Sequence, residues 1–302
     1  MHTDTASDTA ATRPSALHLP RGRHGVLLFH GLSSAPQELI FLARGLHRAG
    51  YTVRLPVIEG YTHGLGEPGR PGATEWLEAA RAELDVLRAE CDHVTVGGLC
   101  VGAVLALCLA ADCADRIAGF MGLSTALHYD GWGNPWYTRL LPLANWLPGA
   151  GRIRIAEGEP FGLKDTRMRA WVARQMQQAG ASDAGAASLQ VRALVQARRL
   201  TREARAALPD VRCPVLLVHA KEDENASPRS AYEVASRVRS PRVWVSLLQD
   251  SYHMISIDQE KATVLQDMRR FLEADPPAVS LSGLRPASQA WPFLQPRTGS
   301  RP

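Results

Sequence analysis

The stretch His93-Val-Thr-Val-Gly-Gly-Leu-Cys-Val-Gly-Ala103 decides the fold of this chain. A short valine-rich run leads into Gly-x-Cys-x-Gly, and the apolar segment Val101–Ala111 follows. This pattern predicts a strand that turns sharply into a helix, with the apex residue Cys100 in a strained backbone conformation. Residues two positions before and after the apex must be small because strand and helix approach closely, and Gly98 and Gly102 meet that need. Cys100 is therefore a candidate nucleophile.

On both sides of this elbow, short apolar runs alternate with helical patterns. Runs rich in valine, isoleucine and leucine are typical of strands buried on both faces of a sheet, and we predict them at Gly25–His30, Tyr51–Val57, His93–Gly98, Ile117–Leu123, Pro214–His219 and Val243–Leu248. Helices are predicted at Pro36–Ala49, Thr74–Glu90, Val101–Ala111, Ala231–Arg239 and Gln259–Ala274. This alternation predicts an α/β fold with a mainly parallel central sheet flanked by helices.

One interval, residues 129–209, interrupts the alternation. It shows no strand pattern, and helices are predicted at Thr166–Gln178 and Ala186–Leu208. We interpret it as a helical cap over the carboxyl edge of the sheet, where α/β proteins bind ligands. The core would then comprise residues 21–128 and 210–275, with an N-terminal tail at 1–20 and a proline-rich C-terminal tail at 276–302.

Composition excludes several classes of protein. Of the 302 residues 45% are hydrophobic and 21% charged, which is typical of a globular protein and not of a disordered one. A net charge of +4 is too small to indicate a nucleic-acid partner. No apolar run approaches the ~18–20 residues of a membrane helix, and no signal peptide is visible, so a cytoplasmic location is expected. The five cysteines show neither Cys-x-x-Cys nor metal-type spacing, and no metal or other cofactor is expected.

The chain resembles the α/β-hydrolase superfamily and, within it, the bacterial carboxylesterase and monoacylglycerol-lipase-like group. Besides the elbow, the residues that carry the resemblance are Val26–Leu32, Pro36–Leu39, Gly50–Val53, Thr74–Trp76, His219–Glu224 and His253–Asp258. It covers roughly residues 24–275 without the cap. Most enzymes of this design have a serine at the elbow apex, whereas this chain has Cys100.

The resemblance implies the remaining catalytic groups. The backbone N–H groups of Val101 and Leu32 would form the oxyanion hole, which stabilises the charge that develops on a carbonyl oxygen during acyl transfer. Asp223 would be the acid and His253 the histidine, in the chain order nucleophile, acid, histidine. Glu222 and Glu224 remain alternatives for the acid because a shift of one residue would exchange their places.

Candidate substrate contacts depart from the family or lie in the cap. After the second strand, relatives have a short Gly-His-Gly, whereas this chain has Glu59-Gly-Tyr-Thr-His-Gly64. Tyr61 and His63 would reach the pocket, or the loop merely forms a turn. Aromatic residues of the cap would line an acyl tunnel or form the cap's own small core: Tyr129, Trp132, Trp136, Tyr137 and Trp146.

A cysteine nucleophile alters which substrates suit the site. Thiolate leaves a tetrahedral intermediate more easily than alkoxide, so thioesters, lactones and activated esters suit Cys100 better than alkyl esters.

We therefore expect an acyl hydrolase of the esterase or thioesterase type acting on a small-molecule acyl substrate. One alternative is an acyltransferase that takes acyl groups from coenzyme A or a carrier protein, attracted by cap arginines. Another is a catalytically inactive hydrolase retained as a binding module. The cap arginines are Arg139, Arg152, Arg154, Arg167, Arg169, Arg198 and Arg199.

Overall fold

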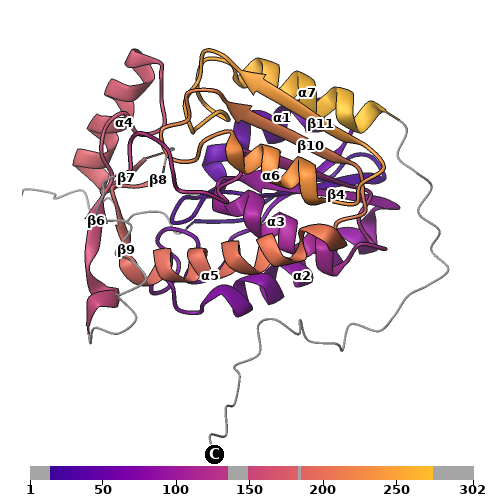
Figure 1. Cartoon of the computed structure of the whole chain (residues 1–302), viewed down its shortest axis with the longest axis horizontal. Coiled ribbons are helices and arrows are strands. Elements are labelled where there is room, and N and C mark those ends of the chain that lie inside the picture. The colour runs from indigo at the N-terminus through magenta and orange to yellow at the C-terminus, as the bar shows by residue number, and fades with distance from the viewer. Residues whose placement is uncertain (1–13, 135–148, 183–184, 275–302) are drawn as a thin grey trace, which may run out of the picture.

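A twisted sheet forms the centre of the molecule (Figure 1). The computed structural model describes residues 14–134, 149–182 and 185–274. The seven strands lie in the order β1-β3-β2-β4-β5-β10-β11, and all neighbours are parallel except β1, which runs antiparallel to β3. The strand bounds are β1 Leu17–Leu19, β2 His24–Phe29, β3 Thr52–Leu55, β4 His93–Leu99, β5 Gly119–Leu123, β10 Val215–Ala220 and β11 Val243–Leu248.

Helices cover both faces of this sheet. Alternate side chains of β2 enter two separate cores, because successive residues of a strand point to opposite faces. One core packs the sheet against α2 (Ala73–Glu90), α3 (Val101–Asp112), α5 (Val191–Ala207) and α6 (Arg229–Arg237). The other packs it against α1 (Ile40–Arg48) and α7 (Lys261–Glu273). The sheet and both helix layers confirm the predicted α/β fold class.

The predicted elements of the sheet and its helices are found within a few residues of their expected bounds. The segment Pro36–Ala49 divides into a 3₁₀ turn, η1 (Pro36–Leu39), and α1. The expected N-terminal tail, residues 1–20, already contains β1 at Leu17–Leu19, which pairs with β3. This strand carries no distinctive apolar pattern of its own. Its position depends on pairing with the side of β3 that β2 leaves open.

The segment predicted as a helical cap also contains short strands. β6 (Arg154–Ala156) pairs with β9 (Ser188–Gln190), and β7 (Ala181–Ser182) pairs with β8 (Gly185–Ala186), around α4 (Thr166–Ala179). Strands of two or three residues are too short to show the alternation from which strands are predicted. In the described ranges, no helix is both long and apolar enough to cross a membrane.

Candidate active site

The elbow predicted from the sequence is present, with Cys100 at its apex. Cys100 follows β4 and precedes the first residue of α3, and it has φ 58° and ψ −120°. A non-glycine residue at positive φ is strained, and the surrounding structure must hold it there. Its N–H donates to the carbonyl of Leu123 on β5 at 3.0 Å, which fixes the turn to the sheet. The half-buried thiol faces a cavity.

The two glycines of the elbow are required by backbone contacts. A Cβ on Gly102 would lie 2.2 Å from the carbonyl oxygen of Phe29 and 2.3 Å from that of His30. A Cβ on Gly98 would lie 2.5 Å from both the Phe29 oxygen and the Gly102 carbonyl carbon. Neither backbone can move aside without disturbing β2 or α3. The pattern Gly-x-Cys-x-Gly thus lets the first turn of α3 pack directly against the end of β2.

Two residues of these elements, Leu32 and Val101, border the same cavity. Val101 begins α3, so its N–H has no partner within the helix. Leu32 lies in the loop after β2, and both residues line the cavity. Among the described residues, neither N–H donates a hydrogen bond. The structure therefore places the two predicted oxyanion donors together beside the thiol.

A buried carboxyl holds the loop of Leu32. Glu38 is 1% exposed, and one of its oxygens accepts the N–H of Gly31 at 3.0 Å. Burial raises the pKa of Glu38 to about 7, although the Ser34 hydroxyl and the Gly31 N–H favour the charged form. No local feature of the sequence distinguishes Glu38 from a surface glutamate on a helical turn, so its role is visible only in the structure.

The structure does not bring Tyr61 or His63 to the cavity. Tyr61 is buried beneath the oxyanion loop, and its hydroxyl donates to the carbonyl of His30 at 2.6 Å. Its carbonyl accepts the N–H of Ser33 at 2.9 Å. His63 is exposed outside the cavity and holds the loop only through its backbone N–H to the Ser34 carbonyl. The loop Glu59–Gly64, which differs from the short Gly-His-Gly of relatives, therefore supports the turn of Leu32 and does not line the cavity.

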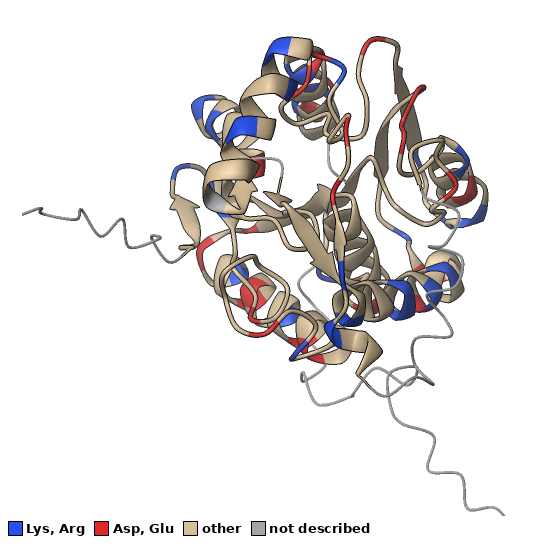
Figure 2. Cartoon of the chain, turned by 90° about the vertical axis from the view of Figure 1, so that its left-hand side faces the viewer, with Lys and Arg blue, Asp and Glu red and all other residues tan. Residues whose placement is uncertain are grey.

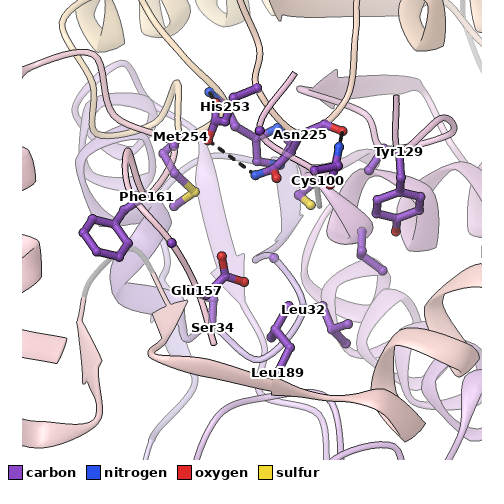
Figure 3. A pocket seen from close by; sticks show the side chains of 18 of the residues that line it. Leu32, Ser34, Cys100, Tyr129, Glu157, Phe161, Leu189, Asn225, His253 and Met254 are labelled. Atoms are coloured by element: carbon purple, nitrogen blue, oxygen red, sulfur yellow. Dashed lines mark hydrogen bonds between the residues drawn. The ribbon is translucent and has the colours of Figure 1, made fainter. Parts of the chain in front are cut away.

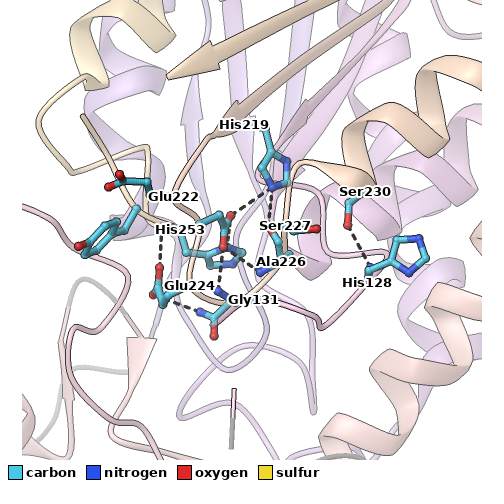
Figure 4. A network of polar contacts seen from close by, with 12 residues as sticks. His128, Gly131, His219, Glu222, Glu224, Ala226, Ser227, Ser230 and His253 are labelled. Carbon is cyan, nitrogen blue, oxygen red and sulfur yellow. Dashed lines mark hydrogen bonds and ion pairs between the residues drawn. The ribbon is translucent and has the colours of Figure 1, made fainter. Parts of the chain in front are cut away.

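Asp223 follows β10 and His253 follows β11, and the two side chains are in direct contact. Figure 4 shows the network of polar contacts around His253, His219 and Glu224. The His253 Nδ1 atom is 2.8 and 2.9 Å from the two carboxylate oxygens of Asp223. Asp223 also accepts the N–H groups of Asn225 and Ala226 at 2.9 and 2.8 Å, and its other oxygen lies 3.3 Å from the His219 Nε2 atom. Asp223 is thus fixed by its own loop and orients the imidazole.

Neighbouring charged groups explain the shifted pKa values of His253 and Asp223. Burial alone would lower the pKa of His253, but Asp223 and the nearby Cys100 outweigh it and raise that pKa well above its usual value. Burial would likewise raise the pKa of Asp223, but His253 and His219 hold it well below the usual range. The His253 Nε2 atom is buried and makes no hydrogen bond of normal geometry with a described residue. Cys100 is near enough to contribute to the raised pKa of His253, and both residues line the cavity.

The structure also distinguishes Asp223 from its acidic neighbours. Glu222 is turned outward and pairs with Lys164 at 2.7 Å. Glu224 is buried but accepts the backbone N–H of His253 at 3.1 Å, not its ring. Only Asp223 of the three contacts the imidazole, because the tight turn after β10 directs alternate side chains in different directions.

The cavity beside Cys100 has a volume of about 350 Å³. Cys100, His253, Leu32 and Val101 border it, and Tyr129 and Glu157 come from the segment predicted as a cap (Figure 3). Trp132 lies elsewhere: it is 62% exposed and packs edge-on against Tyr252. Trp136, Tyr137 and Trp146 lie outside the described residues. A cavity of this size, with the thiol in its wall, is large enough for a small acyl substrate.

The cap arginines do not form one basic surface at this cavity. Those of α4 and α5 lie on two helices that are apart in Figure 1 and carry separate blue segments in Figure 2. Arg169 donates to the Leu163 carbonyl at 2.8 and 3.1 Å, and Arg192 pairs with Glu67. Arg139 lies outside the described residues. Of the described arginines only Arg198 lines the cavity.

The central sheet, the strained elbow and the placement of these side chains define an enzyme of the α/β-hydrolase type. The family model described as serine aminopeptidase, S33, matches residues 20–260, so the chain belongs to this family. It is similar to esterases and lipases, and we assign it to that class of hydrolase.

Individual relatives support this class. The chain is 24% identical over 251 residues to a thermostable monoacylglycerol lipase from Bacillus sp. (strain H-257), covering 83% of this chain and 90% of the lipase. It is 22% identical over 261 residues to a carboxylesterase from Bacillus subtilis (strain 168), covering 86% and 96%. Among solved structures, one reported for the metagenome-derived lipolytic enzymes LipS and LipT matches with a TM-score of 0.73 and 26% identity, covering 86% of this chain and 98% of the other.

Proposed function

We propose that this protein is an acyl hydrolase of the esterase or thioesterase type that works through a covalent acyl-Cys100 intermediate. His253 would act first as base and then as acid, and Asp223 would orient it. The observation that carries this proposal is that Cys100, at a strained turn, borders the same cavity as His253, whose Nδ1 is held by Asp223. The free N–H groups of Leu32 and Val101 on this cavity support an oxyanion site.

The proposed reaction has two halves, the acylation of Cys100 and the hydrolysis of the acyl-cysteine. The Cys100 thiol gives its proton to the His253 Nε2 atom, and the sulfur bonds to the carbonyl carbon, whose oxygen takes the negative charge. When the negatively charged oxygen re-forms the carbonyl double bond, the bond to the leaving group breaks and the leaving group takes the proton from His253. Water then attacks the thioester, giving a proton to His253, and the intermediate expels the Cys100 sulfur, which regains that proton as the carboxylic acid leaves.

The choice between water and another acceptor follows from the relatives and the cavity. The relatives reported above are named as a lipase, a carboxylesterase and lipolytic enzymes, which favours water. Four carboxyl side chains line the cavity among the described residues, which disfavours the anionic groups of coenzyme A. Transfer to an amine or alcohol remains the alternative, and product analysis distinguishes it.

Intact-mass spectrometry tests the proposal directly. Incubation with a panel of acyl thioesters and aryl esters is expected to add one acyl mass to the wild-type chain, and none to Cys100→Ala. Cys100→Ser is the matched variant, since it retains a nucleophile at the same turn. Hydrolysis yields free acid in buffer alone, whereas a transferase yields product only after an amine or alcohol is added.

Two results would contradict the mechanism. Undiminished turnover by Cys100→Ala would show that the thiol is not the nucleophile. Absence of any adduct or product in the wild-type chain with every donor would favour a binding module.

A further inference from the structure

The cavity beside Cys100 contains carboxyl groups that the proposed mechanism does not use. Among the described residues its charged lining comprises Glu38, Glu157, Glu159, Glu224 and a single guanidinium, that of Arg198. Glu38 accepts the Gly31 N–H and supports the oxyanion loop. Glu224 accepts the backbone N–H of His253, whereas Glu157 has no such contact with a described residue.

Glu157 is the most exceptional of these groups. It follows β6, and its backbone N–H donates to the Ala187 carbonyl at 2.9 Å, so the segment that carries it is fixed. Its side chain is partly exposed, lines the cavity, and has no hydrogen bond or ion pair with a described residue. Figure 3 shows the carboxyl pointing into the space that Cys100 and Met254 border. A carboxylate that faces a cavity without a protein partner leaves its acceptor positions open to a ligand.

Glu224 lies near Glu157 in the same wall. It is 3% exposed, and its carboxyl accepts the backbone N–H of His253 at 3.1 Å. Burial first, and then the negative charge of Glu224, raise the pKa of Glu157 to about 7, while His253 opposes this. Burial likewise raises the pKa of Glu224. Both carboxyls belong to the lining of one cavity, which favours a cation there over an anion.

Two positive side chains of the described residues line this cavity, those of Arg198 and His253. Arg198 lies over the ring of Tyr129, 5.9 Å from its centroid, and does not contribute to the pKa shift of Glu157 or Glu224. His253 is the positive group near both, but its Nδ1 is already paired with Asp223.

We propose that Glu157 and Glu224 form a subsite for a cationic nitrogen of the substrate, carried by the acyl chain or by the leaving group. This inference rests on the proposed function, because the cation would be bound while Cys100 attacks the acyl carbon in the same cavity. A cationic nitrogen beside the two carboxylates would form charge-assisted hydrogen bonds with them. The enzyme would then prefer charged over equally large neutral substrates.

Pairs of thioesters that differ in one charge test the subsite. Butanoylthiocholine and S-(3,3-dimethylbutyl) thiobutanoate place the charge in the leaving group, and the 6-aminohexanoyl and heptanoyl thioesters of N-acetylcysteamine place it in the acyl chain. We expect the charged member of at least one pair to have a kcat/KM at least tenfold above that of its neutral partner. In Glu157→Gln that ratio should fall to about one while the neutral substrate reacts at least as fast as before.

Glu78→Gln is the control, because Glu78 is exposed on α2 and does not line the cavity, so solvent screens its charge. This variant should keep the preference. Equal rates for both members of both pairs, or a preference that survives Glu157→Gln, would overturn the subsite. A preference for neutral polyol esters that Glu157→Gln removes would also overturn it, since the carboxyl would then accept hydroxyl groups.

A binding measurement separates this inference from the proposed mechanism. Titration calorimetry on Cys100→Ala measures the affinity for the same thioesters without turnover. Tighter binding of the charged member, lost when Glu157→Gln is added, supports the subsite even if the wild-type chain forms no acyl adduct. Equal affinities contradict the subsite even if the adduct forms.

Discussion

At the scale of single residues, the direct contacts of a side chain define its role. Asp223 is the clearest case, because its two oxygens satisfy His253, His219 and two backbone N–H groups at once. A carboxylate so placed favours the protonated imidazole and fixes which ring nitrogen faces Cys100. The arrangement gives the residue both an orienting and an electrostatic effect.

Asp223→Asn should therefore impair the reaction without unfolding the chain. An amide can occupy the same space, but it removes the charge and favours the wrong imidazole tautomer. We expect kcat to fall by up to about 10⁴-fold and the pKa of His253 to fall toward its usual value. Steady-state kinetics and NMR titration of the imidazole measure the two effects. Glu222→Gln, next to it but turned outward, is the control; an equal loss there would contradict the assignment of Asp223.

Glu38 links stability to pH. Its pKa is raised from 4.5 to about 7 by burial, so the folded state binds a proton more tightly than the unfolded chain. Its contribution to stability is therefore present at low pH and is lost as pH rises from about 4.5 to 7. The shift corresponds to at most ~3 kcal/mol.

In Glu38→Gln this loss should disappear, because the amide still accepts the Gly31 N–H but cannot ionise. Calorimetric Tm values measured from pH 5 to pH 8 should show the variant gaining stability relative to the wild type as pH rises. Parallel curves for the two proteins would show that Glu38 does not titrate in this range.

At the scale of elements, the packing of the β4–α3 elbow against the end of β2 builds the site. The apex thiol, the Val101 N–H and the carbonyls of Phe29 and His30 are brought together because Gly98 and Gly102 carry no side chain. The loop after β2 is supported in turn by Tyr61 and Glu38. The proposed nucleophile and the proposed oxyanion donors are therefore positioned by the same contact between two elements.

Gly102→Ala tests that contact. The added methyl would overlap two backbone carbonyl oxygens, so β2 and α3 must separate, and we expect the free energy of unfolding to fall by about 3 kcal/mol or more. Urea denaturation measures the loss. Gly158→Ala is the control, because its Cβ would meet nothing within 4 Å; a similar loss there would show that the steric argument is wrong.

At the scale of the whole molecule, α5 connects the segment predicted as a cap with the core. Leu194 and Arg198 border the cavity, whereas Leu200 and Ala204, less than two turns further on, are fully buried against α3. One continuous helix thus fixes the cavity wall relative to the helix that follows Cys100. Removing core contacts of α5 should affect stability and the shape of the cavity together.

Leu200→Ala should lower the free energy of unfolding by ~2–5 kcal/mol, as is usual when a buried leucine leaves a cavity, and should raise KM as well. Arg202→Ala, on the exposed side of the same helix, should change neither by much. Thermal unfolding and steady-state kinetics give both values. A loss of stability with unchanged KM would show that the cavity does not depend on this packing.

Local patterns in the sequence were sufficient for the α/β fold and for the elbow at Cys100, because backbone strain, glycine spacing and buried strands leave their mark on neighbouring residues. Tertiary structure alone decided what depends on distant contacts. It brought Asp223 and not Glu222 or Glu224 to the imidazole, placed Tyr61 beneath the loop of Leu32, paired β1 with β3, and put Glu157 and Glu224 into the lining of one cavity. The burial of a carboxyl is set by residues far away in the chain, so its neighbours in sequence do not reveal it.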